Sequence, residues 1–242
     1  MMNNELGINL GCGDWFSHPN WVGLDEINGS PIAVGTKFPC DDSSLSYAYT
    51  SHFLEHIDVE CSQWVFEETY RVLKSGGIFW IVVPDAPLLL ERYKSNDVEF
   101  YDNMGFMGRE EWPRFDIKAN LENRLLHFLC NYDNSGDGPE GSIGFFRGPP
   151  KVDPEIVKSK SEMLGNEEFL EWALSLLPSP EPWIKYQHIN WWSYSKMQKM
   201  LAAAGFNNIT KAVHGTSAIE DANEFDKEAN RSTYSLYIEC EK

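Results

Sequence analysis

The sequence predicts a single α/β domain built on a doubly wound, mostly parallel sheet. Over residues 7–85, short β-rich segments alternate with helical or loop segments, which is the pattern of a parallel sheet. Ile78–Val83 is apolar throughout, as is typical of a central strand covered on both faces. A helix and two strands return after residue 191, and 242 residues suffice for one well-buried domain with an insertion.

The first two strands are short and close together in the sequence. The apolar run Ile8–Leu10 leads directly into Gly11–Gly13, and Trp21–Asp25 follows as a second strand that ends on a carboxylate. Only residues 14–20, including Pro19, separate them, whereas a parallel crossover usually needs about a dozen residues or more. We therefore expect the first crossover helix to be a single turn or missing.

A strand and a capped helix come next. Ser46–Thr50 is rich in β-forming residues and follows a polar turn. Apolar residues then recur at helical spacing up to Leu73, with Asp58 in the position of an N-cap and Gly76 as the expected stop. Pro84 ends the apolar strand that follows.

Residues 96–190 break this alternation. They hold aromatic residues among polar turns, a centre rich in glycine and proline over residues 136–150, and a short amphipathic helix over Glu167–Leu177. We interpret residues 1–95 and 191–242 as one core domain and residues 96–190 as an insertion. The insertion either caps the carboxyl ends of the strands, where ligands bind in open α/β sheets, or is a surface elaboration.

The C-terminal part returns to the core pattern. Ser193 is an expected N-cap for a helix whose apolar residues recur at i, i+3, i+4 and i+7, and Gly205 ends it. Ile209–His214 and Tyr234–Cys240 alternate as strands. The acidic stretch between them, residues 218–230, is expected to be a solvated loop or a short helix.

Composition and charge exclude several classes of function. The chain has 37 acidic and 20 basic residues, a formal charge of −17, and no basic patch, so nucleic acid is not an expected partner. The five cysteines are dispersed without CxxC spacing, which argues against a disulfide framework and against a structural zinc site. No signal peptide is recognisable, and no apolar run approaches the roughly 18 residues that span a membrane, so we expect a cytoplasmic protein.

A glycine turn and a carboxylate follow the first and second strands. Glycine permits a sharp turn and the close approach of a ligand to backbone amides. In α/β sheets such a turn holds one end of a nucleoside ligand, and an acid such as Asp25 accepts hydrogen bonds from ribose hydroxyls. The alternatives are an ordinary turn and a carboxylate that caps a helix or turn.

Five segments in this order resemble the class I S-adenosylmethionine-dependent methyltransferases: Asn9–Gly13, Gly23–Asp25, Phe38–Ser44, Ser51–His56 and Arg71–Gly77. The resemblance covers about residues 7–85, with a further short stretch at 202–206. It implies a Rossmann-like methyltransferase fold and S-adenosylmethionine as the cofactor. The cofactor contacts that we assign from it are Asn9, Leu10, Gly11, Cys12, Gly13, Asp14, Asp25, Gly35, Thr36 and Ser51.

Three positions depart from the family pattern. Asn9 stands where the family usually has an acid, and Asp14 stands where a third glycine is common. The place of an acid that meets the adenine reads Val34–Thr36, so that contact would come from the backbone or from elsewhere. These departures keep a second hypothesis open: a non-catalytic nucleoside-binding or partner-binding module on the same fold.

Two histidines are candidates for catalysis of methyl transfer to a small-molecule or glycan-type acceptor. His52 follows the strand that faces the transferring methyl in the family, and an imidazole titrates near neutrality, so it could accept a proton from a hydroxyl. His188 is the second candidate; for both, the alternative is a structural histidine. His52-x-x-Glu55-His56 also matches the inverted zinc-peptidase signature, which requires one continuous helix.

Overall fold

The computed structural model describes residues 7–13, 16–25, 32–103, 120–130, 152–176, 188–226 and 231–242. The chain forms two compact units, which are described separately. The sheet unit comprises Met1–Val83, Ser193–Ala229 and Ser235–Lys242, and the helical unit comprises Pro84–Trp192 and Asn230–Tyr234.

Six strands of the described residues form one sheet in the order β2-β1-β3-β4-β6-β5. They are β1 (Gly7–Leu10), β2 (Trp21–Leu24), β3 (Leu45–Ser51), β4 (Leu73–Pro84), β5 (Asn207–Ala212) and β6 (Ser235–Glu241). β1 runs parallel to both β2 and β3, and β3 runs parallel to β4, whereas β5 and β6 pair antiparallel. The strand order reverses at β1, so the predicted α/β class with a doubly wound, mostly parallel sheet is confirmed.

β6 runs antiparallel to β4 as well as to β5. At the beginning of β4, the Gly76 amide donates to the Lys242 carbonyl at 2.8 Å, and the Lys242 amide donates to the Gly77 carbonyl at 3.0 Å. The end of β6 therefore lies beside the beginning of β4. Consequently Ser235, the first residue of β6, lies at the edge of the sheet where the parallel strands end.

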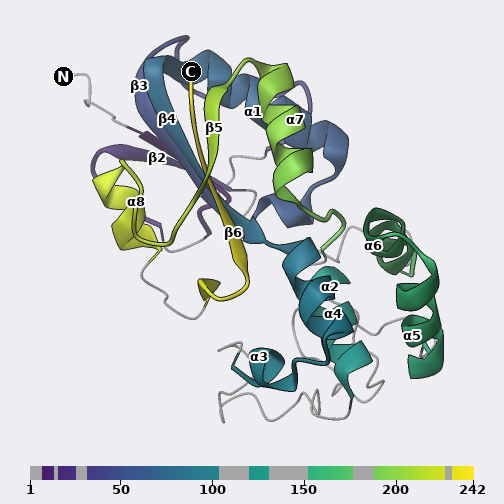
Figure 1. Ribbon diagram of the computed structural model, residues 1–242. Helices are drawn as coiled ribbons and strands as arrows, with labels where there is room; N and C mark the ends of the chain where they lie inside the picture. The colour runs from purple at the N-terminus through teal and green to yellow at the C-terminus, as the bar shows by residue number, and fades with distance from the viewer. Residues whose placement is uncertain are drawn as a thin grey trace, which may run out of the picture. The chain divides into compact units, whose positions relative to one another are not determined.

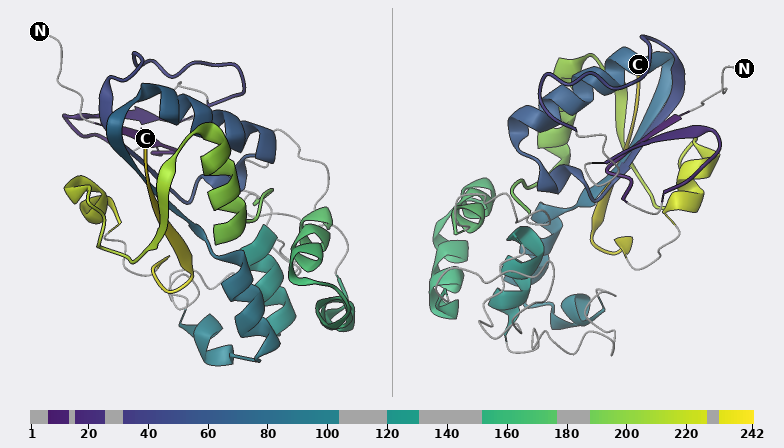
Figure 2. Two further views of the ribbon diagram at one scale, coloured as in Figure 1. Left: turned by 45° about the horizontal axis from the view of Figure 1, so that its top comes forward. Right: turned by 180° about the vertical axis from the view of Figure 1, so that it is seen from behind.

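One face of the sheet is covered by α1 (Val59–Val72) and α7 (Tyr194–Ala204), which lie side by side (Figures 1 and 2). Phe66 of α1 packs against Phe79 of β4, and Phe79 packs against Phe206, which follows α7. All three rings are buried. Because the side chains of β4 alternate between the two faces of the sheet, Phe79 lies on this face and its neighbour Trp80 lies on the opposite one.

The opposite face is covered by α8 (Glu220–Phe225), which Figure 1 shows on the other side of the sheet from α1 and α7. The buried strand residues of this face include Trp21, Tyr49, Trp80 and Tyr237, and Phe225 packs against them. A right-handed crossover from β1 to β2 would place its helix on this face. Residues 16–20 contain no helix, in agreement with the predicted short connection, and α8 covers the face instead.

α1 begins where the sequence predicts, but it ends earlier. The Asp58 side chain accepts the Cys61 amide at 2.7 Å and caps the helix, as expected. The expected stop at Gly76 is wrong, because the helix ends at Val72 and Leu73 already pairs with Leu45 in β3. Buried Leu73 is therefore a strand residue, and an irregularity of the register precedes the regular pairing that starts at Ile78.

The helix before the last two strands agrees with its predicted signals. The Ser193 hydroxyl accepts the Lys196 amide at 3.2 Å, and Gly205 ends the helix with φ +108°. β5 begins at Asn207 and β6 at Ser235, within two residues of the predicted starts. The stretch 218–230 contains α8, so its described part is a short helix with a buried side rather than a solvated loop.

The helical unit contains five described helices: α2 (Ala86–Lys94), α3 (Val98–Asp102), α4 (Leu121–Cys130), α5 (Pro154–Met163) and α6 (Asn166–Ser175). All five contribute residues to one buried apolar core. Asp85, Asp97 and Asp153 each accept a backbone amide at the start of a helix. α6 matches the predicted helix over Glu167–Leu177, and the predicted loop-rich centre over 136–150 lies outside the described residues. Among the helices described in either unit, none has the length and apolarity needed to cross a bilayer.

Candidate functional site

The glycine turn after β1 folds onto the end of β2. Leu10 lies between Leu24 and Thr50 in the parallel register, so β1, β2 and β3 end at the same edge of the sheet. The Gly11 amide donates to the Leu24 carbonyl at 2.8 Å, and the Cys12 amide donates to the same oxygen at 3.3 Å. Gly11 has φ +69° and Gly13 has φ +70°, values that favour glycine because a Cβ is strained there.

The turn and the carboxylate after β2 are joined directly. The Gly13 amide donates to Oδ2 of Asp25 at 2.9 Å. A charged acceptor makes a strong hydrogen bond to a backbone N–H. The structure therefore brings together the two features that the sequence predicts for nucleoside binding, and the hydrogen bond fixes the orientation of the partly buried carboxylate.

The two glycines of the turn have different surroundings. A Cβ at Gly11 would overlap the ring of Phe53, so this position needs glycine for packing against the segment after β3. A Cβ at Gly13 would meet no described atom within 4 Å. Among the described residues, Gly13 is thus the position of the turn at which a ligand can approach the backbone closely.

Three other predicted contact residues lie in or beside this turn. The side chains of Leu10 and Asn9 are buried. A ligand at the turn would therefore meet mainly the backbone of Leu10. The Sγ atom of Cys12 lies over Gly23, where a Cβ would come within 2.8 Å of it. Asp14 lies outside the described residues.

Gly35 and Thr36 belong to a turn that rests on α1 rather than to a strand. The Thr36 amide donates to the Ala33 carbonyl at 3.0 Å, and the Thr36 carbonyl accepts from Nε1 of Trp64 at 3.4 Å. Gly35 has φ +85°, and a Cβ there would meet no described atom within 4 Å. Since residues 32–44 form no strand, β2 is the outermost strand on its side of the sheet in the described residues.

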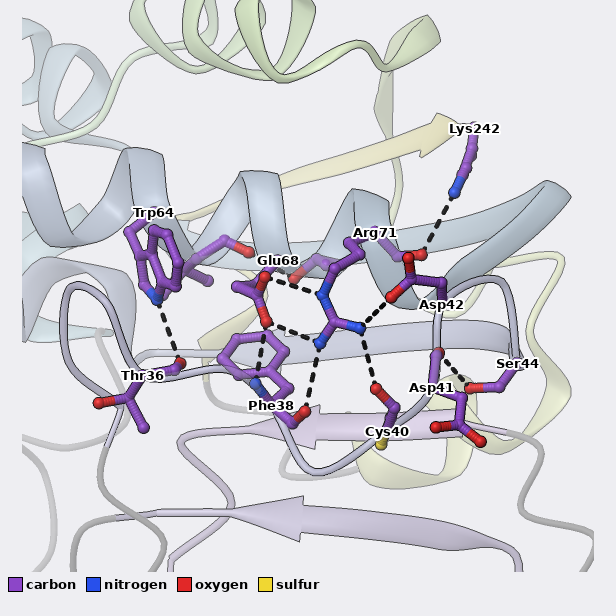
Figure 3. A network of polar contacts seen from close by, with 12 residues as sticks. Thr36, Phe38, Cys40, Asp41, Asp42, Ser44, Trp64, Glu68, Arg71 and Lys242 are labelled. Carbon is purple, nitrogen blue, oxygen red and sulfur yellow. Dashed lines mark hydrogen bonds and ion pairs between the residues drawn. The ribbon is translucent and has the colours of Figure 1, made fainter.

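Arg71 of α1 fixes the chain that follows this turn (Figure 3). Its guanidinium donates to the carbonyls of Phe38 at 3.2 Å and Cys40 at 3.0 Å, and to the carboxylates of Asp42 and Glu68, both at 2.7 Å. The Phe38 amide completes the network by donating to Glu68 at 2.9 Å. Four of these hydrogen bonds join residues 38–42 to α1, and the fifth joins Arg71 to Glu68 within the helix.

The charges of this network shift the titration of its members. Burial works to raise the pKa of the Glu68 carboxyl, but the hydrogen bonds from Arg71 and the Phe38 amide outweigh it and hold the pKa below its ordinary value. The hydrogen bond from Arg71 likewise lowers the pKa of Asp42. The hydrogen bond to Glu68 raises the pKa of Arg71. All three groups are therefore charged at neutral pH.

Ser51 and His52 stand at the end of β3, beside the glycine turn. Ser51 is the last residue of β3 and pairs with Val82. His52 has φ +50°, and its amide donates to the Val82 carbonyl at 2.9 Å. Its Nδ1 lies 3.1 Å from Oε1 of Glu55, and its Nε2 lies 2.9 Å from the hydroxyl of Ser235. The imidazole is therefore held on both sides.

The geometry of this segment contradicts the zinc-peptidase interpretation. That signature places two histidines one turn apart on a continuous helix. Here a 3₁₀ helix of three residues, Leu54–His56, begins after His52, whose backbone is left-handed. Both imidazoles face the same carboxylate oxygen of Glu55, at 3.1 Å for His52 and 4.0 Å for His56.

His188 belongs to the helical unit. Its Nδ1 lies 2.9 Å from the Phe128 carbonyl, so one ring nitrogen makes a hydrogen bond within that unit. Its catalytic role stays a prediction.

Sequence reasoning did not assign Phe53 or Ser235 to the site. Phe53 packs on Gly11, and no local pattern marks that contact. Ser235 is 183 positions from His52 in the sequence. The signal that could have found it is the predicted C-terminal strand, because an antiparallel strand beside β4 must start at the edge where β3 ends.

Comparison with known proteins finds similarity in structure only. No protein-family model matches the sequence, and no curated protein matches it. A methyltransferase from Mesorhizobium loti that depends on S-adenosylmethionine is 15% identical, with 99% of this chain and 92% of that chain covered and a TM-score of 0.39. One from Archaeoglobus fulgidus is 13% identical, with 98% and 86% covered and a TM-score of 0.39.

A Thermotoga maritima protein described as a possible histamine N-methyltransferase is 12% identical, with 98% of this chain and 82% of that chain covered and a TM-score of 0.38. Similarity at this level does not assign a cofactor or an acceptor to the chain. The turn after β1, Asp25 and the residues after β3 are the structural features that bear on function.

Proposed function

We propose that the chain is a methyltransferase that binds S-adenosylmethionine at the ends of β1 and β2 and methylates a small-molecule or glycan-type acceptor. The observation that carries this proposal is the hydrogen bond from the Gly13 amide to Asp25. It joins the glycine turn, in which a Cβ at Gly13 would meet no described atom within 4 Å, to the carboxylate of Asp25 at the end of β2. This is the pairing of groups that a nucleoside with a charged amino-acid tail requires.

The residues present fit this cofactor. A carboxylate accepts about four hydrogen bonds, so the contact with Gly13 is compatible with ribose hydroxyls as further donors to Asp25. No atom of the described residues lies within 4 Å of a Cβ at Gly13, which supports a close approach of the cofactor to the backbone there. The formal charge of −17 favours a cationic sulfonium and disfavours a phosphate-rich acceptor such as nucleic acid.

The bound cofactor would supply an activated methyl group on a positively charged sulfur. The protein then has to align the acceptor with the methyl and exclude water, which can lower a barrier by roughly 7–11 kcal/mol. For a hydroxyl acceptor, His52 at the end of β3 would take the proton, a role that is worth about 10²–10⁴ in rate. His188 is the second candidate for this role.

The alternative is a module that binds the nucleoside without turning over an acceptor. Asn9, which is buried in β1 where the family usually has an acid, is the observation that favours it. Saturable binding of the cofactor together with no methylation of any alcohol, phenol, amine or thiol would support this alternative.

Calorimetry with S-adenosylmethionine and with its demethylated product tests the proposal. We expect Asp25→Ala to abolish measurable binding, because the ribose loses its acceptor and the Gly13 amide loses its partner. Asp41→Ala is a matched control, because this exposed aspartate lies in the turn after Cys40. Unchanged affinity in Asp25→Ala would refute the assignment of the ribose, and loss of affinity in both variants would point to misfolding.

A further inference from the structure

Three polar side chains form a line at the end of β3. Oε1 of Glu55 lies 3.1 Å from Nδ1 of His52, and the hydroxyl of Ser235 lies 2.9 Å from Nε2 of the same ring. The topology creates this line, because antiparallel β6 starts at the edge where parallel β3 ends. All three residues belong to the sheet unit.

Burial increases along the line from Ser235 to Glu55. The Glu55 side chain is 2% exposed and that of His52 is 12% exposed, whereas Ser235 is partly exposed. The acid end is therefore shielded from water and the hydroxyl end is accessible. Electrostatic interactions are stronger in such a shielded place than in water.

The backbone of His52 is held in an uncommon conformation. A non-glycine residue with positive φ costs about 1–2 kcal/mol, and His52 has φ +50°. The hydrogen bond from its backbone amide to the Val82 carbonyl, at 2.9 Å, stabilises this conformation. Strain of this kind persists only where the surroundings fix it, and here it directs one ring nitrogen to each neighbour.

The neighbours also assign the tautomer of the ring. A carboxylate accepts hydrogen bonds but does not donate them, so the contact of 3.1 Å between Nδ1 and Oε1 of Glu55 favours the tautomer with its proton on Nδ1. Nε2 then carries a lone pair, and the Ser235 hydroxyl donates to it. A hydroxyl oxygen has two lone pairs, so Oγ of Ser235 has the chemical capacity to accept a hydrogen bond from a hydroxyl while its own hydrogen is donated to Nε2.

We infer that Ser235, His52 and Glu55 form a proton relay that serves a hydroxyl acceptor, with Ser235 as the member that contacts the acceptor; this inference rests on the proposed function. The acceptor oxygen forms a bond to the methyl carbon, and the carbon–sulfur bond breaks with its electron pair on sulfur. The acceptor proton passes to Oγ of Ser235, and the serine proton passes to Nε2. The resulting imidazolium is stabilised by Glu55 until the proton leaves to water.

The relay specifies the class of acceptor. A neutral amine attacks with its lone pair and releases its proton to water afterwards, so it gains little from a built proton path. An alcohol or phenol must lose its proton as the new bond forms, and a base at hydrogen-bonding distance accelerates that step. We therefore expect methylation at oxygen. In this scheme Glu55 is a positioning residue, because it acts through His52.

The tautomer can be measured independently of turnover. Long-range ¹H–¹⁵N correlation spectra of the full chain should show His52 with a proton on Nδ1 and none on Nε2. The Nε2 resonance should shift in Ser235→Ala, and the tautomer should change in Glu55→Ala. A proton on Nε2 in the neutral ring, or spectra that neither variant changes, would overturn the relay. Ser46→Ala in β3 is the matched serine control and should leave the ring signals unchanged.

Kinetics test whether the relay moves a proton. With a panel of alcohols and phenols as acceptors, Ser235→Ala should lower kcat about 10²-fold or more while the KM for S-adenosylmethionine stays constant, and Ser235→Thr should restore much of the rate. The wild-type solvent deuterium isotope effect should fall in Ser235→Ala. Equal kcat values in Ser235→Ala and wild type would overturn the relay, as would methylation only of amines and thiols in matched panels.

The outcomes separate the relay from the proposed function. Absent cofactor binding in the wild type refutes methyl transfer, yet the tautomer still decides whether the three side chains are arranged as inferred. Cofactor binding with oxygen methylation that is insensitive to Ser235→Ala and Glu55→Ala upholds the function and refutes the relay. Cofactor binding without methylation of any alcohol or phenol refutes the hydroxyl acceptor.

Discussion

Tyr49 of β3 donates its phenolic hydrogen to Asp226 at 2.6 Å, across 177 positions of sequence. The other oxygen of the same carboxylate accepts Nε1 of Trp80 at 2.8 Å. Trp21 of β2 donates to Asp221 of α8 in a similar way, at 2.7 Å. These hydrogen bonds attach α8 and the residue after it to the aromatic face of the sheet, where no crossover helix lies in the described residues 16–20.

Removal of the Asp226 carboxylate should destabilise the sheet unit. Asp226→Ala leaves two buried donors, on Tyr49 and Trp80, without their acceptor, and each such group costs about 1–3 kcal/mol. Urea denaturation should show a loss of about 2–4 kcal/mol. Glu220→Ala, on the exposed side of α8, should change stability by less than about 0.5 kcal/mol. Equal stability of the two variants would contradict this account of how α8 is held.

Arg71 should be among the most sensitive residues of α1. Arg71→Ala removes the partner of the nearly buried Glu68 carboxylate, and breaking such a pair typically costs about 3–5 kcal/mol. The stability of Arg71→Lys should lie between those of wild type and Arg71→Ala, because an ammonium keeps the charge but cannot form the planar fork to Glu68 and Asp42. Denaturant midpoints should fall most in Arg71→Ala, less in Arg71→Lys and least in Lys74→Ala, which is the exposed control. A denaturant midpoint of Arg71→Ala equal to that of wild type would contradict this account of the network.

The same network should make stability depend on acid pH. The ordinary pKa values of Glu68 and Asp42 are 4.5 and 3.8, and both are lowered in the folded chain. The unfolded chain therefore binds more protons than the folded chain in acid. The stabilisation of the fold by these two carboxylates is complete above their ordinary pKa values and is lost as the pH falls through their lower pKa values in the folded chain. Urea midpoints between about pH 6 and about pH 3 should fall less steeply in Glu68→Gln than in wild type. Parallel curves would contradict the assignment.

The two glycines of the turn should respond differently to alanine. Gly11→Ala combines a positive φ with overlap on Phe53, so it should cost about 1–3 kcal/mol more than Gly13→Ala, whose Cβ meets no described atom. Gly13→Ala should instead weaken binding of S-adenosylmethionine, because its methyl group occupies the space proposed for the cofactor. Denaturation and calorimetry on both variants test this contrast. A stable Gly11→Ala, or a Gly13→Ala with full affinity, would contradict it.

The sequence predicts elements whose signals are local. The cap at Asp58, the apolar run of β4 and the helix between Ser193 and Gly205 each appear within a few residues, and the structure has all three. The proximity of the glycine turn and Asp25 also follows, because parallel strands end at one edge.

What could not be predicted depends on contacts between distant positions. Leu73 has good helical spacing, but its pairing with Leu45 makes it a strand residue. The buried side of α8 depends on Tyr49 and Trp80, and the hydrogen bond of His52 to Ser235 depends on the direction of β6. A local pattern contains no information on these partners.

The most direct test of the proposed cofactor site is an NMR titration of the full chain with S-adenosylhomocysteine, followed through backbone amides. We expect saturable shifts that are largest at Gly11–Gly13 and Asp25, because the Gly13 amide already donates to the carboxylate that would take the ribose. Spectra that do not change at these amides, or shifts that are confined to other residues, would contradict the assignment of this turn as the cofactor site.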